Sequence, residues 1–324
     1  TSPTGGTLLN PAGAIWVSNV NSSMTLLNSV VTGNSTGSEG GGITNWGTLT
    51  IDNTVVSGNS AGVNGGGIYN TGVLTITNST ITGNTAAGRG GGIHNEGSSL
   101  AIPHTLTMDA STISDNVASG SGGGLSNEAE ATAVIERSLI SGNDGIFGAG
   151  VWVSGPSVAT NDVQLLNSTI SGNLGTGVEA DSTTANAYLY FSTVANNTTG
   201  VYGRGTSPNN TVVLARSLVA DNATDCLGSI GMAAYNLIGI VDAGCTPVNA
   251  GTGDQIGSPG APIDPLLGPL GDNGGPTLTH ALLPGSSAID AEPGLACLPI
   301  DQRGEPRPEP GGSACDIGAF EVQA

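Results

Sequence analysis

Apolar and polar residues alternate along most of this chain, and the alternation repeats. In the stretch LTITNSTITGN at 74–84, Leu74, Ile76 and Ile81 stand among threonines, which is the period-two pattern of a strand rather than the 3.6-residue period of a helix. The motif NSTITGN occurs eight times in related forms, and its final asparagines lie 24 to 32 residues apart, at positions 34, 59, 84, 116, 143, 173, 197 and 222. A period of this length is typical of a solenoid in which each repeat forms one coil.

Three apolar positions recur in every repeat, which predicts three short strands per coil with one inward column each. The first column is Ile15, Ile43, Ile68, Ile93, Leu125, Val151, Val178 and Val201. The second is Leu26, Ile51, Ile76, Met108, Ile135, Leu165, Leu189 and Leu214. The third is Val31, Val56, Ile81, Ile113, Ile140, Ile170, Val194 and Val219. Stacking by parallel pairing, with the usual right-handed crossover, predicts an all-β, right-handed parallel β-helix of eight to nine coils.

Glycine and asparagine supply the expected corners of each coil. GGGI at 40–43, 65–68 and 90–93, and GGGL at 122–125, place glycine where a tight corner requires a positive φ. The motif asparagines predict a ladder in which each side-chain amide bonds to the asparagine of the next coil. A second ladder is predicted for Asn45, Asn70, Asn95 and Asn127.

The charge of the chain narrows its partners. Of 324 residues only six are basic, all of them arginine, and the net charge is −19, so nucleic acid and anionic membranes are poor partners. No run of 18 apolar residues is present, so we expect no transmembrane segment. The chain begins at Thr1 without a methionine or a charged leader, which we expect of a mature exported chain.

The four cysteines, Cys226, Cys245, Cys297 and Cys315, all follow the repeats. Their spacing is unlike that of a zinc site, and three disulfide connectivities are possible. Cys226–Cys245 with Cys297–Cys315 is the simplest pairing. Disulfides would place the protein outside the cytosol.

The repeat pattern stops near Cys226, so the sequence predicts a β-helix domain at 1–225 and a capping region at 226–324. In the second region Arg303 and Arg307 stand among acidic residues, which we interpret as a charged lock on an irregular cap. Four stretches of this region are distinctive: YNLIG (235–239), DPLLGPLGDNGGPTLTHALLPGSSAIDA (264–291), DQRGEPRP (301–308) and CDIGAFE (315–321).

These stretches resemble the choice-of-anchor Q domain of secreted and surface-attached bacterial proteins, and the GG-x-I repeats resemble those of polymorphic outer-membrane proteins. The resemblance implies a secreted, extracellular or bacterial cell-surface protein, often with a sorting tail after this domain. The sequence up to Ala324 shows no such tail, so we expect either that the tail was cleaved or that this member has none. The resemblance implies no particular reaction.

One outward position, directly after the first apolar column, collects aromatic residues. It holds Trp16, Tyr69, His94, Trp152 and Tyr202, with Thr44, Ser126 and Glu179 at the intervening coils. Exposed rings in a row stack on sugars or pack on a partner protein. Insertions at 98–104, 154–162 and 203–210 follow the same strand, so loops that cover these rings are the equal alternative.

Other candidate chemistry is sparse. Asp264, Asp272 and Asn273 offer oxygens to Ca²⁺, the only cofactor that we consider. His94, Glu96 and His104 are interpreted as polar loop residues rather than a metal site. The repeats contain no lysine and no cluster of aspartates on adjacent coils, which disfavours a polysaccharide lyase or hydrolase.

The sequence therefore predicts a non-enzymatic structural protein that associates with itself head to tail into a filament or surface layer. The open strand edges of the coil ends motivate this prediction. The first alternative is an adhesin that binds extracellular polysaccharide through the aromatic column. A polysaccharide-active enzyme is the second.

Overall fold

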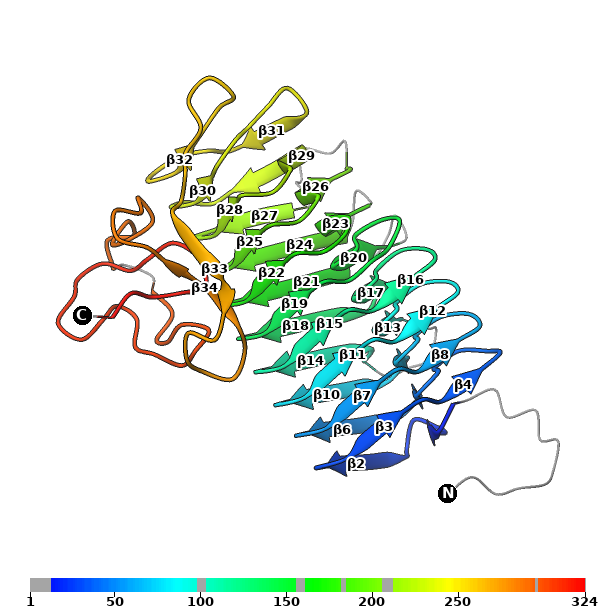
Figure 1. Ribbon diagram of the computed structural model, residues 1–324. Coiled ribbons are helices and arrows are strands. Elements are labelled where there is room, and N and C mark those ends of the chain that lie inside the picture. Colours follow the sequence, from blue (N-terminus) through cyan, green and yellow to red (C-terminus); the bar gives the residue numbers. More distant parts are fainter. Residues whose placement is uncertain are drawn as a thin grey trace, which may run out of the picture.

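A computed structural model shows a stack of β-coils with an irregular C-terminal region beside it (Figure 1). It describes residues 13–97, 103–155, 161–181, 185–205, 212–294 and 297–323. Within these ranges the secondary structure consists of strands, without an α-helix. The fold is the predicted right-handed parallel β-helix.

Each coil contributes strands to three faces. The first face contains β1 (Ile15–Val17), β5 (Ile43–Asn45), β9 (Ile68–Asn70), β13 (Ile93–Glu96), β17 (Leu125–Glu128), β20 (Val151–Ser154), β23 (Thr176–Ala180) and β26 (Thr199–Gly203). The second contains β2 (Ser23–Leu27), β6 (Thr48–Asp52), β10 (Val73–Thr77), β14 (Thr105–Asp109), β18 (Thr132–Glu136), β21 (Asn161–Leu166), β24 (Ala185–Tyr190) and β27 (Val212–Ala215). These two faces form one continuous sheet.

The third face is a separate ten-stranded parallel sheet. Its strands are β3 (Val30–Thr32), β7 (Val55–Ser57), β11 (Thr80–Thr82), β15 (Thr112–Ser114), β19 (Leu139–Ser141), β22 (Thr169–Ser171), β25 (Thr193–Ala195), β28 (Leu218–Ala220), β30 (Leu237–Ile238) and β32 (Gln255–Ile256). A short fourth sheet follows in the first four coils, with β4 (Ser35–Thr36), β8 (Ser60–Ala61), β12 (Thr85–Ala86) and β16 (Val117–Ala118).

Parallel pairing continues past the predicted boundary at residue 225. The long strand β29 (Thr224–Met232) pairs with β26 and β27, and then β31 (Cys245–Val248) pairs with β29. On the third face β32 pairs with β30. The stack therefore ends near Ile256, and the boundary at 225 falls inside it.

The three predicted apolar columns are confirmed by the strand register. Ile43 pairs with Ile68 on the first face, Ile51 with Ile76 on the second and Val56 with Ile81 on the third. Nearly all members of the columns are fully buried and belong to one hydrophobic cluster along the stack. Because each coil is too small to bury its own apolar residues, this shared core joins all coils into one unit.

Both predicted asparagine ladders are present. Along the motif ladder each side-chain amide donates to the Oδ1 of the next asparagine at 2.8–3.0 Å, as in Asn84 to Asn116 (2.9 Å) and Asn116 to Asn143 (3.0 Å). The backbone N–H of Asn84 also donates to Asn116 Oδ1, and Asn116 Nδ2 donates to the Ile81 carbonyl. Each rung thus satisfies several buried polar groups of neighbouring coils.

The motif ladder has a direction and an end. Asn222, its last asparagine, donates from its backbone N–H and its amide to Asp225 Oδ1, and Asp225 Oδ2 accepts from the Ile240 N–H. A neighbouring ladder of Ser and Thr residues passes through Ser217 and Asn236 and ends on Asp254. Because an ionised carboxylate accepts but cannot donate, each aspartate terminates its ladder at the C-terminal end of the stack.

Positive φ angles recur at fixed corners. Gly40, Gly65, Gly90 and Gly122 have φ between 63° and 66°, as the GGG corners predict. A second positive-φ corner is the first residue of each motif, as at Asn53 (φ 45°). The ladder asparagines themselves are not at positive φ, because the residue before each one makes that turn. This residue is a glycine in most coils, such as Gly58 (φ 61°), and Asp115, Asn196 or Asp221 in the others.

Residues 226–256 of the predicted capping region form the last coil of the stack, whereas the described residues after 256, called the C-terminal region below, pack against its side rather than across its end. The C-terminal region lies beside the upper coils, against the third face and the corner before it (Figure 1). Asn167 Nδ2 donates to the Ile300 carbonyl, and the Ala319 N–H donates to Thr193 Oγ1. Its only regular element within the described residues is the antiparallel pair β33 (Leu267–Gly271) and β34 (Thr279–Leu282).

The reason for this side-on position is the outward surface of the upper coils. There Leu218, Ala220 and Leu237 stand in the columns that hold Thr169 and Ser171 two coils below Leu218 and Ala220, and they form a second apolar cluster with the C-terminal residues Leu282, Ala288, Ile317 and Phe320. Burial of this apolar surface favours docking along the side.

We predict that Asn116→Ala lowers the free energy of unfolding by about 2–5 kcal/mol, because it leaves several buried groups of adjacent coils without partners. Asn78→Ala is the matched control, since Asn78 is exposed and the same corner already holds Ala110 at φ 48°. The control should cost no more than about 1 kcal/mol. Chemical denaturation measures both, and equal losses would contradict the structural role of the ladder.

Candidate functional site

The predicted outward column exists, but most of it is not exposed. Strand pairing places Trp16, Tyr69, His94, Trp152 and Tyr202 in one row with the intervening residues. Only Trp16 is open, at 40% exposure, and Tyr202 is half-buried; Tyr69, His94 and Trp152 are buried at 7%, 1% and 4%. The ligand-binding role of the column remains a prediction, but three of the five aromatic side chains are too buried here to stack on a sugar.

The buried part of the column is a closed stack of rings and charges. The Tyr69 ring lies nearly parallel to His94, with centroids 5.5 Å apart, and the Tyr69 hydroxyl donates to Glu96 Oε2 at 2.6 Å. Arg89, from the preceding corner, pairs with Glu128 and lies over the Trp152 ring at 5.0 Å. These contacts use the ring faces that a sugar would need.

The electrostatics of this stack follow from its contacts. Burial, and then the Glu96 carboxylate, raise the pKa of Tyr69, while the neighbouring His94 holds the pKa of Glu96 below its usual range. His94 lies between two carboxylates, 3.5 Å from Glu96 and 3.7 Å from Glu128. His104 is elsewhere, with its Nδ1 2.6 Å from the Thr71 carbonyl oxygen, so the structure does not join His94, Glu96 and His104 into one site.

The three insertions that follow this strand fall largely outside the described residues, which exclude 98–102, 156–160 and 206–211. Whether they cover the column stays a prediction.

The calcium candidates separate into two places. Asp272 lines a small pocket near Thr112, and Asn273 next to it donates its amide to the Thr279 carbonyl. Asp264 lines a different pocket of about 270 Å³, together with Asp221 and Asp225. A calcium site made of Asp264, Asp272 and Asn273 together is therefore not formed, and a cofactor role for calcium remains untested.

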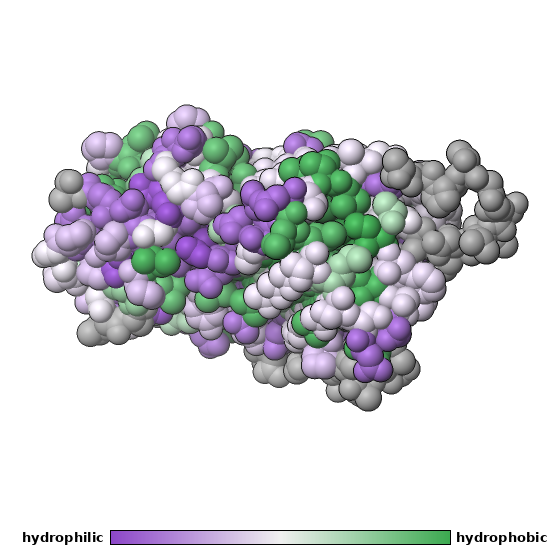
Figure 2. Space-filling view, turned by 90° about the horizontal axis from the view of Figure 1, so that it is seen from below, coloured by the Kyte–Doolittle hydropathy of each residue, from purple (hydrophilic) through white to green (hydrophobic). Residues whose placement is uncertain are grey.

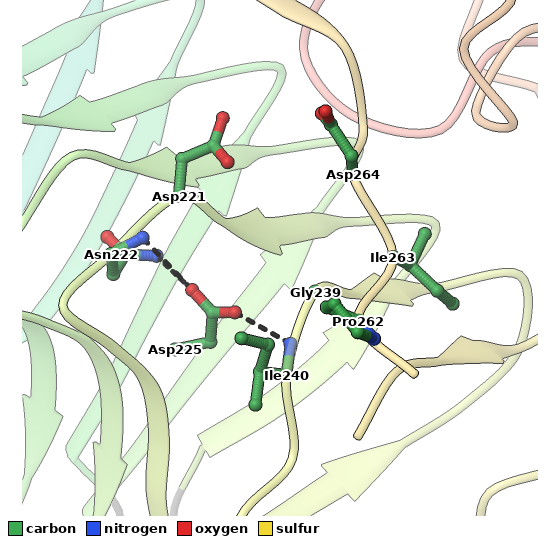
Figure 3. Close-up of a pocket in the computed structure, with 8 residues that line it drawn as sticks. All are labelled: Asp221, Asn222, Asp225, Gly239, Ile240, Pro262, Ile263 and Asp264. Atoms are coloured by element: carbon green, nitrogen blue, oxygen red, sulfur yellow. Dashed lines mark hydrogen bonds between the residues drawn. The ribbon is translucent and has the colours of Figure 1, made fainter. Parts of the chain in front are cut away.

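The Asp264 pocket lies between the upper coils and the start of the C-terminal region (Figure 3). The side chains of Asp221 and Asp264 stand on either side of it, and burial and then repulsion from Asp264 raise the pKa of Asp221. Asp225 below them is the ladder terminator, with both carboxylate oxygens bonded. Sequence reasoning missed Asp221 and Asp225, because they lie in the last full repeat, where the motif RSLVADN replaces the usual Gly with Asp221.

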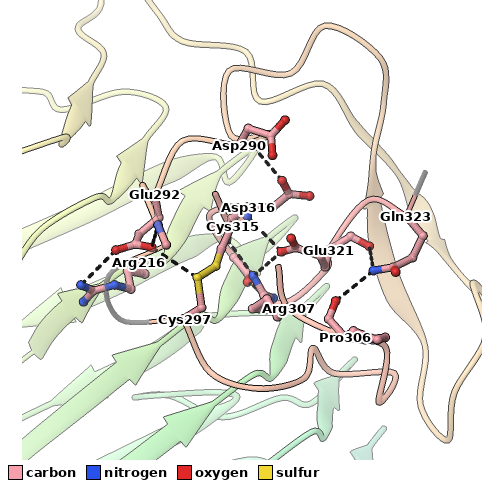
Figure 4. The surroundings of a disulfide bond; sticks show 12 residues. Arg216, Asp290, Glu292, Cys297, Pro306, Arg307, Cys315, Asp316, Glu321 and Gln323 are labelled. Atoms are coloured by element: carbon pink, nitrogen blue, oxygen red, sulfur yellow. Dashed lines mark hydrogen bonds and ion pairs between the residues drawn. A yellow bond between two sulfur atoms is a disulfide. The ribbon is translucent and has the colours of Figure 1, made fainter. Parts of the chain in front are cut away.

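Both predicted disulfides are present, Cys226–Cys245 and Cys297–Cys315, with Cα–Cα distances of 5.4 Å and 6.3 Å. The first joins β29 and β31 at the end of the stack, and the second lies in the C-terminal region. Figure 4 shows the second among the charged residues of the predicted lock. Arg307 is fully buried; it donates to Glu321 Oε2 at 3.1 Å and to two backbone carbonyls. The lock is confirmed, and disulfides are typical of proteins outside the reducing cytosol.

The fold and the disulfides define a disulfide-bonded parallel β-helix protein. A family model described as periplasmic copper-binding protein (NosD) matches residues 20–214, and the chain belongs to this NosD family. The crystal structure of pectate lyase Pel9A is similar in fold, with a TM-score of 0.51 and 16% sequence identity over 91% of this chain and 70% of that chain. No curated protein sequence matches this chain. The described residues contain no helix long and apolar enough to cross a membrane.

The lock predicts a pH-dependent stability. Burial raises the pKa of Glu321 from 4.5 to about 7, although Arg307 opposes the shift. Between these two pKa values the folded state keeps a proton on Glu321 that the unfolded state has released. The stability that this proton contributes is therefore complete below pH 4.5 and is lost as the pH rises through about 7.

Glu321→Gln should remove this part of the pH dependence, an effect on the order of 1–3 kcal/mol between pH 4.5 and 7. The exposed neighbour Glu305 supplies the control, Glu305→Gln, which should keep the wild-type profile. Denaturation midpoints measured across this pH range test the prediction; a Glu321→Gln profile parallel to wild type would refute it.

Proposed function

We propose that this protein is a non-catalytic structural protein outside the cytosol, and that its copies associate head to tail through the open ends of the coil stack. Disulfides and membership of a family described as periplasmic support the location. The single observation that carries the assembly is the apolar, uncharged end of the first coil.

Among the described residues, nothing pairs with the outer strand edges of the first coil, and several of its apolar side chains are exposed. Its strands β2, β3 and β4 each pair with the next coil on one side only. Five of its large apolar side chains are exposed, by 67% for Val30, 55% for Leu27, 40% for Trp16 and Val20, and 38% for Met24. Figure 2 shows the molecule from below, with a group of hydrophobic residues near the middle of this face and smaller groups elsewhere. Open edges combined with exposed apolar residues favour association with another chain.

The charge distribution favours this end for contact between copies. The chain carries a net charge of −19, yet its first charged residue is Glu39. Two acidic molecules repel each other over about 8–10 Å at ordinary salt. At the uncharged end of the first coil this repulsion between copies is weakest. The free energy gained by burying apolar side chains can exceed it there.

The opposite end offers the complementary edge. β3 and β32 are the two outer strands of the third-face sheet, so the last coil of one copy can extend that sheet at the first coil of the next. Ile240 and Ile256 are 40% and 39% exposed there. Because Asp225 and Asp254 terminate the ladders, the contact would use strand edges and apolar side chains rather than side-chain ladders.

Val30→Asp tests the proposal, because it places a charge in the apolar end at a position too exposed to disturb the core. Leu174→Asp is the matched control, since Leu174 is also 67% exposed but lies on the side of the sixth coil. In sedimentation velocity we expect wild type and Leu174→Asp to form concentration-dependent polymers and Val30→Asp to remain monomeric.

A wild-type protein that stays monomeric at high concentration would contradict self-association. Dimers without larger species would indicate that two first coils meet head to head. Loss of assembly on deletion of residues 1–12 alone would assign the contact to that segment.

The alternatives receive less support from the site. An adhesin that binds polysaccharide through the aromatic column needs exposed rings, and this column offers only Trp16 and half-buried Tyr202. For an enzyme, the carboxylates of Asp221 and Asp264 share one pocket, but no basic residue lines it. The similarity to pectate lyase at 16% identity concerns the fold alone.

Copper binding, the property in the family's description, fits this chain poorly. All four cysteines are in disulfides, including the two sulfurs beside Glu292. The three histidines are buried in separate places, and His280 has both nitrogens engaged, with Gly268 and Ser171. Soft thiolates and accessible imidazoles are the ligands that copper prefers.

We therefore expect equilibrium dialysis against copper and a competing chelator of micromolar affinity to leave no stoichiometric copper on the protein. One retained copper per chain that is lost in His94→Ala would show that the family's property applies here.

A further inference from the structure

We propose that a cavity beside Tyr190 binds a neutral pyranose sugar. The cavity has a volume of about 400 Å³ and is lined by Gln164, Leu166, Tyr190, Phe191, Arg216 and Leu298. It lies where the second face of the sixth and seventh coils meets the C-terminal region. The inference is independent of self-association and of the aromatic column on the first face.

The floor of the cavity departs from the repeat. On β10 and β14 the outward positions hold polar residues such as Thr77 and Asp109; in the sixth and seventh coils the same column holds Leu166 and Tyr190. Tyr190 is 38% exposed, whereas we would expect its ring to be buried if it served only to pack against neighbouring residues. Its next neighbour in the column, Ala215, is buried, and the adjacent Arg216 lines the cavity instead.

The walls come from two other segments. Leu298 belongs to the C-terminal region, and the adjacent Cys297 is fixed by its disulfide to Cys315. Arg216 borders the other side, with a side chain that is 17% exposed. Phe191, which also lines the cavity, is buried and lies near the guanidinium groups of both Arg216 and Arg307, with φ at 47°. A bulky residue in this rarely populated conformation needs strong support from its surroundings, and the cavity therefore has a rigid base.

The chemistry of the lining fits a pyranose. An exposed tyrosine ring between leucines offers an apolar platform for the C–H face of the sugar, and Gln164 and Arg216 place hydrogen-bonding groups at the rim for its hydroxyls. An apolar cavity with few polar groups at its edge is the usual form of such a site.

Charge selects a neutral sugar over an acidic one. Arg216 is already offset by Glu292, which is fully buried 3.4 Å away (Figure 4). The whole chain is strongly acidic, at −19, and repels anions. An uncharged sugar avoids that repulsion, and it can still stack on the Tyr190 ring and form hydrogen bonds with Gln164 and Arg216.

The test uses saturation-transfer NMR and calorimetry on the full chain with maltose, cellobiose, lactose and mannobiose, and with digalacturonate as the acidic counterpart. We expect saturable binding of at least one neutral disaccharide, weaker binding of digalacturonate and little dependence on salt. Tyr190→Ala should weaken binding about tenfold or more, because ring stacking and apolar burial are lost together.

Tyr188→Ala is the matched control, since Tyr188 also points outward from β24 but does not line the cavity, and it should bind as wild type. Leu298→Asp should lose binding through the opposite wall. The proposal is overturned if no neutral disaccharide shows saturable binding, if Tyr190→Ala binds as wild type, if Tyr188→Ala loses as much as Tyr190→Ala, or if digalacturonate binds best.

Discussion

The structure depends on one repeated interaction, the buried asparagine amide that bonds to the same amide one coil away. Each rung satisfies a side chain, a backbone N–H and a carbonyl that would otherwise be buried without partners, as Asn84 and Asn116 show. A coil that slipped by one residue would lose these bonds and turn its apolar columns outward. The ladder therefore fixes the register, and the register keeps Ile, Leu and Val columns in line along the stack. This arrangement allows a chain with only 3% aromatic residues to form a long continuous core.

The ladder also makes the two ends of the molecule different. Donors point toward the C-terminal end, where Asp225 and Asp254 accept the last bonds and finish the ladders. At the N-terminal end Asn34 donates to Asn59, and within the part of the chain that the structure describes β2, β3 and β4 pair only with the next coil, beside exposed Leu27 and Val30. The C-terminal region covers neither end. It lies along the side, where Leu218 and Leu237 give it an apolar surface, and there it builds the disulfide-pinned wall of the Tyr190 cavity.

Much of the fold was predictable because its signal is repeated. Eight copies of one motif identify the columns, the ladders and the GGG corners, and errors in one coil are corrected by its neighbours. Features that occur only once in the chain were harder to predict from the sequence. The side-on position of the C-terminal region depends on single residues such as Leu218, and the pocket around Asp221 depends on a substitution in the last motif. The exposure of the aromatic column was also not predictable from the sequence, because the contacts that close it join different coils: Arg89 pairs with Glu128 of the next coil and lies over the Trp152 ring of a later one.

The chain belongs to a family described as copper-binding and shares its fold with a pectate lyase, and we propose association of its copies rather than either chemistry. Hydrogen–deuterium exchange at increasing protein concentration tests this account most directly. If copies join through their ends, amides of β2 and β3 in the first coil and of β31 and β32 in the last should become protected as concentration rises, while central coils such as that of β14 stay unchanged. Exchange that is independent of concentration at both ends would contradict the account.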